Sequence, residues 1–171
     1  MRFSNRIGAL LMVFAETAMG ATSPDCVTDK YQRYTEAQRT WQQGLTQLVV
    51  DVAPGYEDLA QRYLEDQLRL IELRELEMAY FAHAAPAKLR MQQPLHSWLS
   101  LSKTDRQQLA SKSERYAQLR DQARAARSRP AHPRGANLRE IMKNEIMTSS
   151  EYKDLLQEFL EATNAAEAIK C

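Results

Sequence analysis

Residues 56–85, YEDLAQRYLEDQLRLIELRELEMAYFAHAA, show the clearest helical pattern in the chain. Their large apolar side chains recur every three or four positions, which places them on one side of a helix. They are Leu59, Tyr63, Leu64, Leu68, Ile71, Met78 and Phe81. Further apolar residues widen that side (Leu70, Leu73, Leu76 and Tyr80), and Pro86 follows as a stop signal. We therefore expect a long central helix that contacts several neighbours.

The composition favours helices in the rest of the chain as well. The 171 residues include 23 Ala and 20 Leu but only 5 Val and 5 Ile, and Gly and Pro together are few. So small a number of β-branched aliphatic residues argues against a β fold. The length suits one domain with a sizeable core, because a chain of about 150 residues buries roughly two thirds of its extended surface.

Similar patterns flank the central helix. Residues 29–52 carry one apolar stripe, and Ala53-Pro54-Gly55 ends it. The segment 87–101 has no lasting period, so we expect a loop over the core with three side chains turned inward: Leu95, Trp98 and Leu99.

Capping signals mark the remaining helices. Ser102 and Asp105 predict a capping box, and the helix after it should run to about Arg127. Residues 128–136 contain two Pro and a Gly and are typical of a linker. Asn137 is the expected cap of a short helix. Thr148 and Glu151 predict a second capping box, whose helix should bury a set of large residues: Tyr152, Leu155, Leu156, Phe159 and Leu160. The expected fold is all-α, an antiparallel up-and-down bundle of four to five helices.

The first twenty residues have the layout of a secretory signal. A short basic region with Arg2 and Arg6 precedes an uncharged apolar run, residues 7–15, and Ala18-Met19-Gly20 supplies small residues for cleavage. An uncleaved tether and an ordinary N-terminal helix are the alternatives. We expect residues 1–20 to be a signal peptide and residues 21–171 to form a single helical domain that is periplasmic or secreted and not transmembrane.

The two cysteines lie near opposite ends of the expected mature chain. Cys26 follows the predicted cleavage site and Cys171 is the last residue. An oxidising compartment favours a disulfide between them, although free or intermolecular thiols are the alternative. Such a bond would be worth about 4–5 kcal/mol in the chain-entropy model.

Templates for catalysis and metal binding are missing from the sequence. The three histidines, His83, His96 and His132, are scattered and form no metal-ligand motif, and there is no nucleophile elbow or glycine-rich phosphate loop. Glu72, Glu75 and Glu77 resemble an ordinary solvated helix face. We therefore expect no metal, no cofactor and no enzymatic activity. A cryptic enzyme or inhibitor would require a deep pocket lined by carboxylates with perturbed pKa values.

The near-zero net charge hides two opposite segments. Residues 57–77 carry seven acidic and three basic residues, whereas residues 103–134 carry nine basic and three acidic ones. Arginine suits recognition of phosphate and carboxylate, so the basic segment is a candidate for binding an anionic partner. Its candidate residues are Arg120, Arg124, Arg127, Arg129 and Arg134. The alternative is that it lies against the acidic helix or only keeps the surface soluble, and export disfavours nucleic acid as the target.

Two short segments, residues 101–107 and 138–143, resemble parts of the small all-helical periplasmic chaperones of the Spy/CpxP type. The chain lacks the L-T-x-x-Q signature of those chaperones, so the resemblance does not assign it to them. The sequence predicts an exported, non-enzymatic interaction module that binds a protein or an anionic component of the envelope. A holdase-like periplasmic chaperone or stress protein is the alternative.

Overall fold

The computed structural model describes residues 23–171, and this part of the chain is built from helices. Six α-helices lie within these residues: α1 (Pro24–Val52), α2 (Glu57–Ala84), α3 (Lys103–Lys112), α4 (Glu114–Arg127), α5 (Gly135–Ile141) and α6 (Ser150–Ala168). The all-α prediction is confirmed, with slightly more helices than expected. The predicted signal peptide lies outside the described residues.

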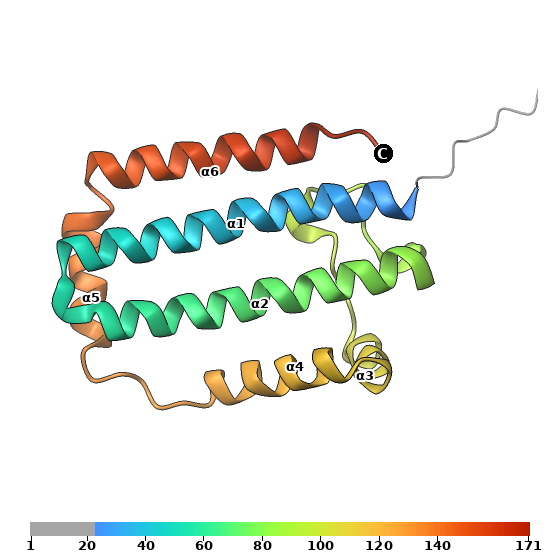
Figure 1. Cartoon of the computed structure of the whole chain (residues 1–171), viewed down its shortest axis with the longest axis horizontal. Coiled ribbons are helices and arrows are strands. Elements are labelled where there is room, and N and C mark those ends of the chain that lie inside the picture. The colour runs from blue at the N-terminus through green and yellow to red at the C-terminus, as the bar shows by residue number, and fades with distance from the viewer. Residues whose placement is uncertain (1–22) are drawn as a thin grey trace, which may run out of the picture.

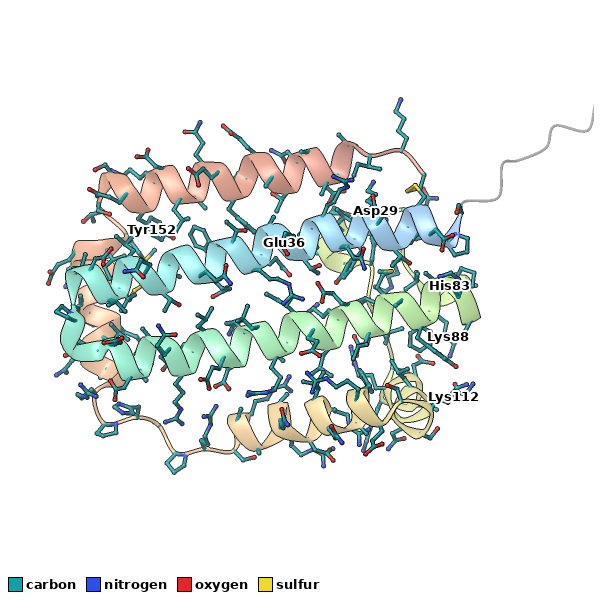
Figure 2. All side chains as sticks on the ribbon, in the orientation of Figure 1. Asp29, Glu36, His83, Lys88, Lys112 and Tyr152 are labelled. Carbon is teal, nitrogen blue, oxygen red and sulfur yellow. A yellow bond between two sulfur atoms is a disulfide. The ribbon has the colours of Figure 1, made fainter. Side chains whose placement is uncertain are left out.

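The four longer helices lie side by side in the order α6, α1, α2 and α4 (Figure 1). Each helix runs antiparallel to its neighbour in this row. Tyr152, in the first turn of α6, lies next to α1 (Figure 2), where its ring packs edge-on against Trp41. The long helix α2 lies between α1 and α4, which confirms its central place.

The turn between α1 and α2 forms where the sequence predicts it. Ala53 follows the end of α1, and Pro54 opens a short 3₁₀ turn, Pro54–Tyr56. The Tyr56 N–H donates to the Ala53 carbonyl at 2.9 Å. Because proline cannot continue a helix, α1 ends here and α2 returns antiparallel to it.

Two hydrophobic clusters form the core, one at each end of the row. The larger cluster joins α1, α2, α3, α4 and the end of α6 to the segment after α2, and its most buried members include Tyr31, Met78, Phe81, Leu95 and Tyr116. The smaller cluster lies where α5 crosses the α1–α2 turn, and contains Val49, Leu59, Ala60, Leu138 and Ile146.

The connection between α2 and α3, residues 85–102, covers part of the larger cluster. The predicted inward side chains Leu95, Trp98 and Leu99 are all buried, which confirms that prediction. The Leu95 N–H donates to the Glu167 carboxylate at 2.6 Å, so the segment is also attached to α6. The Ser102–Asp105 capping box is present as predicted.

The prediction of a single helix after Ser102 is wrong, because the helix is interrupted at Ser113. Ser113 has an extended backbone, and its side chain accepts a hydrogen bond from the Tyr116 N–H at 3.2 Å. This local cap begins α4 and ends α3, so the two helices point in different directions (Figure 1).

Two predicted caps near the C-terminus are also wrong. The short helix α5 begins at Gly135 rather than after Asn137, because the Arg134 carbonyl already accepts from the Leu138 N–H. It continues as a π-helical turn, Met142–Ile146. Ser149, not Thr148, caps α6 by accepting from the Tyr152 N–H at 3.1 Å. The prediction that α6 buries five large residues is wrong, because α6 lies at the edge of the row and packs mainly on α1. Four of them are half-buried, and Leu160 is 49% exposed.

The predicted disulfide between Cys26 and Cys171 is confirmed. Their Cα atoms are 5.7 Å apart, within the range that a disulfide spans. The bond ties the first turn of α1 to the last residue of the chain, next to the end of α6.

Candidate functional site

The structure divides the five candidate arginines into two groups. Arg129 and Arg134 lie along the first half of α2, where Arg129 pairs with Asp66. Arg134 donates to both carboxylate oxygens of Asp58, at 2.7 and 2.6 Å, and its guanidinium lies over the Tyr56 ring. These two arginines therefore hold the predicted linker, residues 128–136, against the acidic helix.

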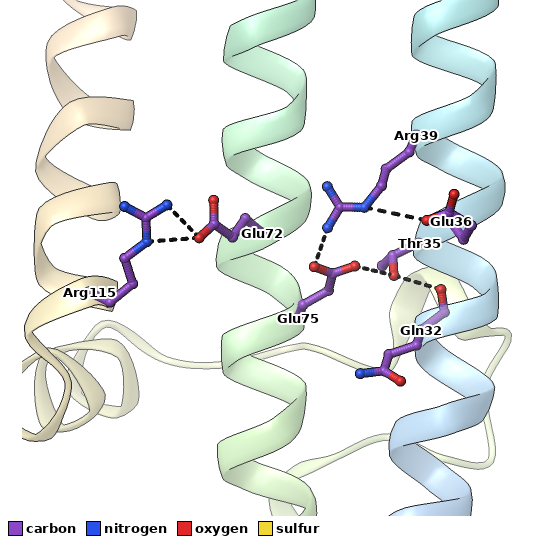
Figure 3. Close-up of polar contacts among 7 residues, drawn as sticks. All are labelled: Gln32, Thr35, Glu36, Arg39, Glu72, Glu75 and Arg115. Carbon is purple, nitrogen blue, oxygen red and sulfur yellow. Dashed lines mark hydrogen bonds and ion pairs between the residues drawn. The ribbon is translucent and has the colours of Figure 1, made fainter.

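The carboxylates of α2 also pair with both neighbouring helices (Figure 3). Arg115 of α4 donates to Glu72 at 2.8 Å, and Arg39 of α1 pairs with Glu75. Glu75 also accepts from the Thr35 hydroxyl at 2.7 Å. These contacts balance part of the acidic charge of α2 within the protein.

The other three candidate arginines, Arg120, Arg124 and Arg127, line a pocket of about 390 Å³ between α2 and α4. Two arginines outside the predicted set also line it, Arg74 of α2 and Arg106 of α3. The remaining lining residues are Leu70, Leu73, Glu77, Tyr116 and Ala123. Five arginines and one carboxylate from three helices thus surround one hollow.

Glu77 lies in this lining and is only 5% exposed, so the expectation of a solvated face is wrong for this residue. Its Oε1 accepts from Arg106 Nε at 2.9 Å and from the Tyr116 hydroxyl at 2.7 Å. Burial and then the Glu77 carboxylate raise the pKa of Tyr116, which keeps this phenol a donor. Arg106 also donates to the Leu101 carbonyl at 2.8 Å, so Glu77 joins α2, α3 and α4.

The other arginines of the pocket have weaker partners. Arg120 and Arg124 share the exposed Asp121 at 3.5 and 3.6 Å, distances too long for a strong ion pair. The Nε atom of Arg120 is buried and has no hydrogen-bond partner. Within residues 23–171, neither Arg74 nor Arg127 forms an ion pair with a carboxylate. The pocket therefore contains positive charge that the described protein groups do not neutralise.

No local signal in the sequence separates Arg74 and Arg106 from ordinary surface arginines. Arg74 is surrounded in sequence by glutamates, and Arg106 follows a capping box. A helical projection of α2 does place Leu70, Arg74 and Glu77 on one face. Which helix packs on that face, however, depends on the break at Ser113.

A second hollow, of about 720 Å³, lies between α1 and α6. Its floor is largely apolar and includes Trp41 and Phe159, whose ring centroids are 5.4 Å apart. Charged side chains on its rim, Asp29, Arg33, Glu36 and Glu158, border this groove. Figure 2 shows Asp29 and Glu36 along α1.

The carboxyl groups with shifted pKa values belong to caps and ion pairs. Hydrogen bonds from Lys88 and Ser102 lower the pKa of Asp105 to about 2. Partial burial opposes the shift at Asp58, but the Leu59 N–H and Arg134 lower its pKa overall. Hydrogen bonds at the start of α6 lower the pKa of Glu151. These shifts favour permanent negative charge, whereas a general acid needs a raised pKa.

Potential metal ligands do not gather in groups of three or more within residues 23–171. In the same residues, the helices are too short or too polar for a bilayer-spanning segment.

Comparisons of the chain with protein-family models, with curated proteins and with solved structures found no match. Any functional conclusion therefore rests on the residues and geometry of this chain.

Proposed function

We propose that the protein is an exported, non-enzymatic binding protein of the periplasm or another extracytoplasmic space, and that it binds an anionic component of the cell envelope. The observation that carries this proposal is the pocket between α2 and α4, with five arginines against the single carboxylate Glu77. Guanidinium groups bind carboxylates and phosphates through paired hydrogen bonds, and a partly enclosed site strengthens those bonds.

The proposed compartment has a separate basis. A disulfide between Cys26 and Cys171 is typical of proteins that fold in an oxidising compartment, and the sequence before it has the layout of a signal peptide. The mass of the chain recovered from the periplasmic or secreted fraction tests this part of the proposal. A chain that begins near Ala21 supports it, and a full-length chain recovered from the cytoplasm contradicts it.

The binding proposal is tested by capture of crosslinked envelope components on the purified protein. The test variant replaces Arg120, Arg124 and Arg127 with Gln. The matched control replaces three exposed basic residues elsewhere with Gln: Arg90, Lys143 and Lys153. We expect the pocket variant to recover about tenfold less envelope material than the wild type, as the loss of charge-assisted hydrogen bonds implies, and the control to recover as much as the wild type. Equal losses in both variants, or no loss in either, would contradict the proposal.

The groove between α1 and α6 favours a second candidate function, that of a holdase-like chaperone. Its apolar floor with Trp41 and Phe159 suits transient contact with unfolded chains. This function predicts that the protein suppresses the aggregation of unrelated unfolded proteins at near-stoichiometric ratios, and that Trp41→Ser weakens the suppression. An absence of suppression by the wild type excludes this candidate.

A further inference from the structure

Positive charge exceeds negative charge among the residues that line the arginine-lined pocket. Arg106 and the Tyr116 hydroxyl satisfy Glu77 at 2.9 and 2.7 Å, so this carboxylate already has close partners. The guanidinium groups of Arg74, Arg120, Arg124 and Arg127 remain, and the nearest acid to Arg120 and Arg124 is the exposed Asp121. A ligand with one negative charge would leave most of this positive charge unneutralised.

Arg120 lacks a protein acceptor at one of its donor atoms. Its Nε is buried and has no hydrogen-bond partner, although Arg120 lines the pocket. An unsatisfied buried donor destabilises the folded state, and more so when the group is charged. The Arg120 side chain as a whole is 30% exposed and lines the pocket, so a ligand there can contact its guanidinium group, although not at the buried Nε.

The shape of the donor set favours a compact, tetrahedral group. The arginines come from α2, α3 and α4 and surround a hollow of about 390 Å³. A phosphate group has three outer oxygens directed apart and carries a charge of about −1.5 to −2 at neutral pH. It can therefore accept from several guanidinium forks at once, whereas a planar carboxylate offers two oxygens and a single charge.

We infer that this pocket binds a phosphomonoester group in its dianionic form, with Arg74, Arg120, Arg124 and Arg127 as its ligands. The inference rests on the proposed function, because it names the chemistry of the anion that the pocket binds. The phosphate group can belong to a small molecule or to a lipid headgroup, and both present the same oxygens.

Isothermal titration with glycerol phosphate tests the inference on the full mature chain. In the test variant, Arg120→Lys with Arg127→Lys, the charge remains and the paired hydrogen bonds are lost. In the matched control, Arg90→Lys with Arg139→Lys, the same change is made at exposed arginines outside this pocket. We expect the affinity to fall about tenfold in the test variant and to stay unchanged in the control. An unchanged affinity in the test variant overturns the inference. If that variant unfolds, the exposed Arg124→Gln replaces it with the same expectation.

The pH dependence of binding tests the charge of the ligand. The charged groups that face the pocket are the five arginines from α2, α3 and α4 and the carboxylate of Glu77, and Tyr116 is the other ionisable residue of the lining. A phosphomonoester loses its second proton near pH 6, so its affinity should rise between pH 5 and pH 7.5. Inorganic sulfate is a dianion at both pH values, so its affinity should not change. A parallel change for sulfate, or a constant affinity for glycerol phosphate, contradicts a dianion site.

Flotation with phosphatidylcholine vesicles that contain phosphatidic acid separates the two sources of phosphate. If the protein binds these vesicles and the double variant Arg120→Lys and Arg127→Lys does not, the site takes a lipid headgroup. If the protein binds glycerol phosphate but not the vesicles, the site takes a small molecule. If neither probe binds while envelope capture still depends on the pocket arginines, the proposed function stands and the phosphate inference is wrong. If a probe binds but envelope capture does not depend on the arginines, the inference stands and the proposed function is wrong.

Discussion

Glu77 shows how one buried charge organises the interface between α2, α3 and α4. Its carboxylate accepts from Arg106 and from the Tyr116 hydroxyl, and Arg106 also donates to the Leu101 carbonyl. A buried ion is tolerated only when such partners replace its lost hydration. Glu77, Arg106 and Tyr116 also line the arginine-lined pocket, so the interface and the proposed site share these polar contacts.

Replacement of Tyr116 by Phe removes one of the two donors to Glu77. We expect the free energy of unfolding to fall by about 1.5–3 kcal/mol, because the lost hydrogen bond is to a buried charged group. Urea denaturation measures the change. Tyr63→Phe is the control, since Tyr63 is largely exposed, and it should change the stability by less than about 0.5 kcal/mol. Equal stabilities of Tyr116→Phe and the wild type would contradict the role assigned to this hydroxyl.

The lowered pKa of Asp105 leads us to expect that the protein loses stability in acid. Hydrogen bonds from Lys88 and Ser102 lower this pKa from 3.8 to about 2, so the contribution of Asp105 is complete above about pH 5 and disappears as the pH falls towards 2. The difference in unfolding midpoint between the wild type and Asp105→Asn should therefore be constant from pH 7 to pH 5 and shrink between pH 4 and pH 2. Denaturation curves at pH 7, 5, 4, 3 and 2 test this, and a difference that grows in acid would contradict it.

Among the contacts between helices, the one between α1 and α6 is close because α1 has a glycine, Gly44, at this position. A Cβ atom at this position would lie 2.6 Å from Leu155 Cδ1 of α6. Glycine inside a helix costs about 1 kcal/mol relative to alanine, so its presence here is explained by the close packing of the two helices. The contact lies beside the groove whose floor contains Trp41 and Leu155.

A large side chain at position 44 should separate α6 from α1. Gly44→Leu is expected to lower the free energy of unfolding by about 1–3 kcal/mol, the usual cost of overpacking. Urea denaturation gives this value, and hydrogen exchange should show faster exchange in α6 than in α2. Gly55→Ala is the control, because no atom lies within 4 Å of a Cβ at Gly55. A stability equal to that of the wild type would show that α6 adapts without cost.

The helices could be predicted from the sequence where a periodic stripe of apolar residues packs against the core. The patterns of residues 29–52 and 56–85 correspond to α1 and α2, and the Ser102–Asp105 box begins α3 as predicted. The break at Ser113 was not predictable from periodicity, because a serine cap competes with a helix that could otherwise continue. The position of Leu160 fits the apolar stripe and predicts an inward side chain, but α6 has too few neighbours to cover it.

The candidate site could be predicted only in part, because the sequence does not show which helices pack together. The excess of arginines in residues 103–134 indicates an anion-binding or self-paired segment. It does not show that Arg129 and Arg134 pair with α2 while Arg120, Arg124 and Arg127 line a pocket. That division depends on where α4 ends and on which carboxylates of α2 face it, and both follow from tertiary packing.

At the scale of the whole molecule, the four longer helices of residues 23–171 form a row with α6 at one edge and α4 at the other (Figure 1). An edge helix has fewer neighbours than a central one and gains less from burial. The Cys26–Cys171 disulfide joins the C-terminal end of α6 to the start of α1, and Lys30 donates to the carbonyls of Glu167 and Ile169 at the same end. The edge of the row is therefore held by both covalent and polar contacts.

Removal of the disulfide should lower the stability of the whole domain. In the double variant Cys26→Ser and Cys171→Ser, we expect the free energy of unfolding to fall by about 4–5 kcal/mol, as the chain-entropy model gives for a loop of this length. Urea denaturation measures this loss, and the wild type in reductant serves as the control and should match the variant. A variant as stable as the oxidised wild type would contradict this account of the disulfide.

The central claim, that the arginine-lined pocket binds an anionic envelope component, is tested most directly by site-specific photocrosslinking in intact cells. A photoreactive residue in place of Asp121, beside the pocket, is compared with one in place of Lys153 on α6. Lys153 is exposed and lies outside the pocket. We predict a discrete crosslinked product from position 121, absent from position 153, that disappears when Arg120 and Arg127 are replaced by Gln. Equal crosslinking from both positions, or a product at position 121 that survives these replacements, would contradict the claim.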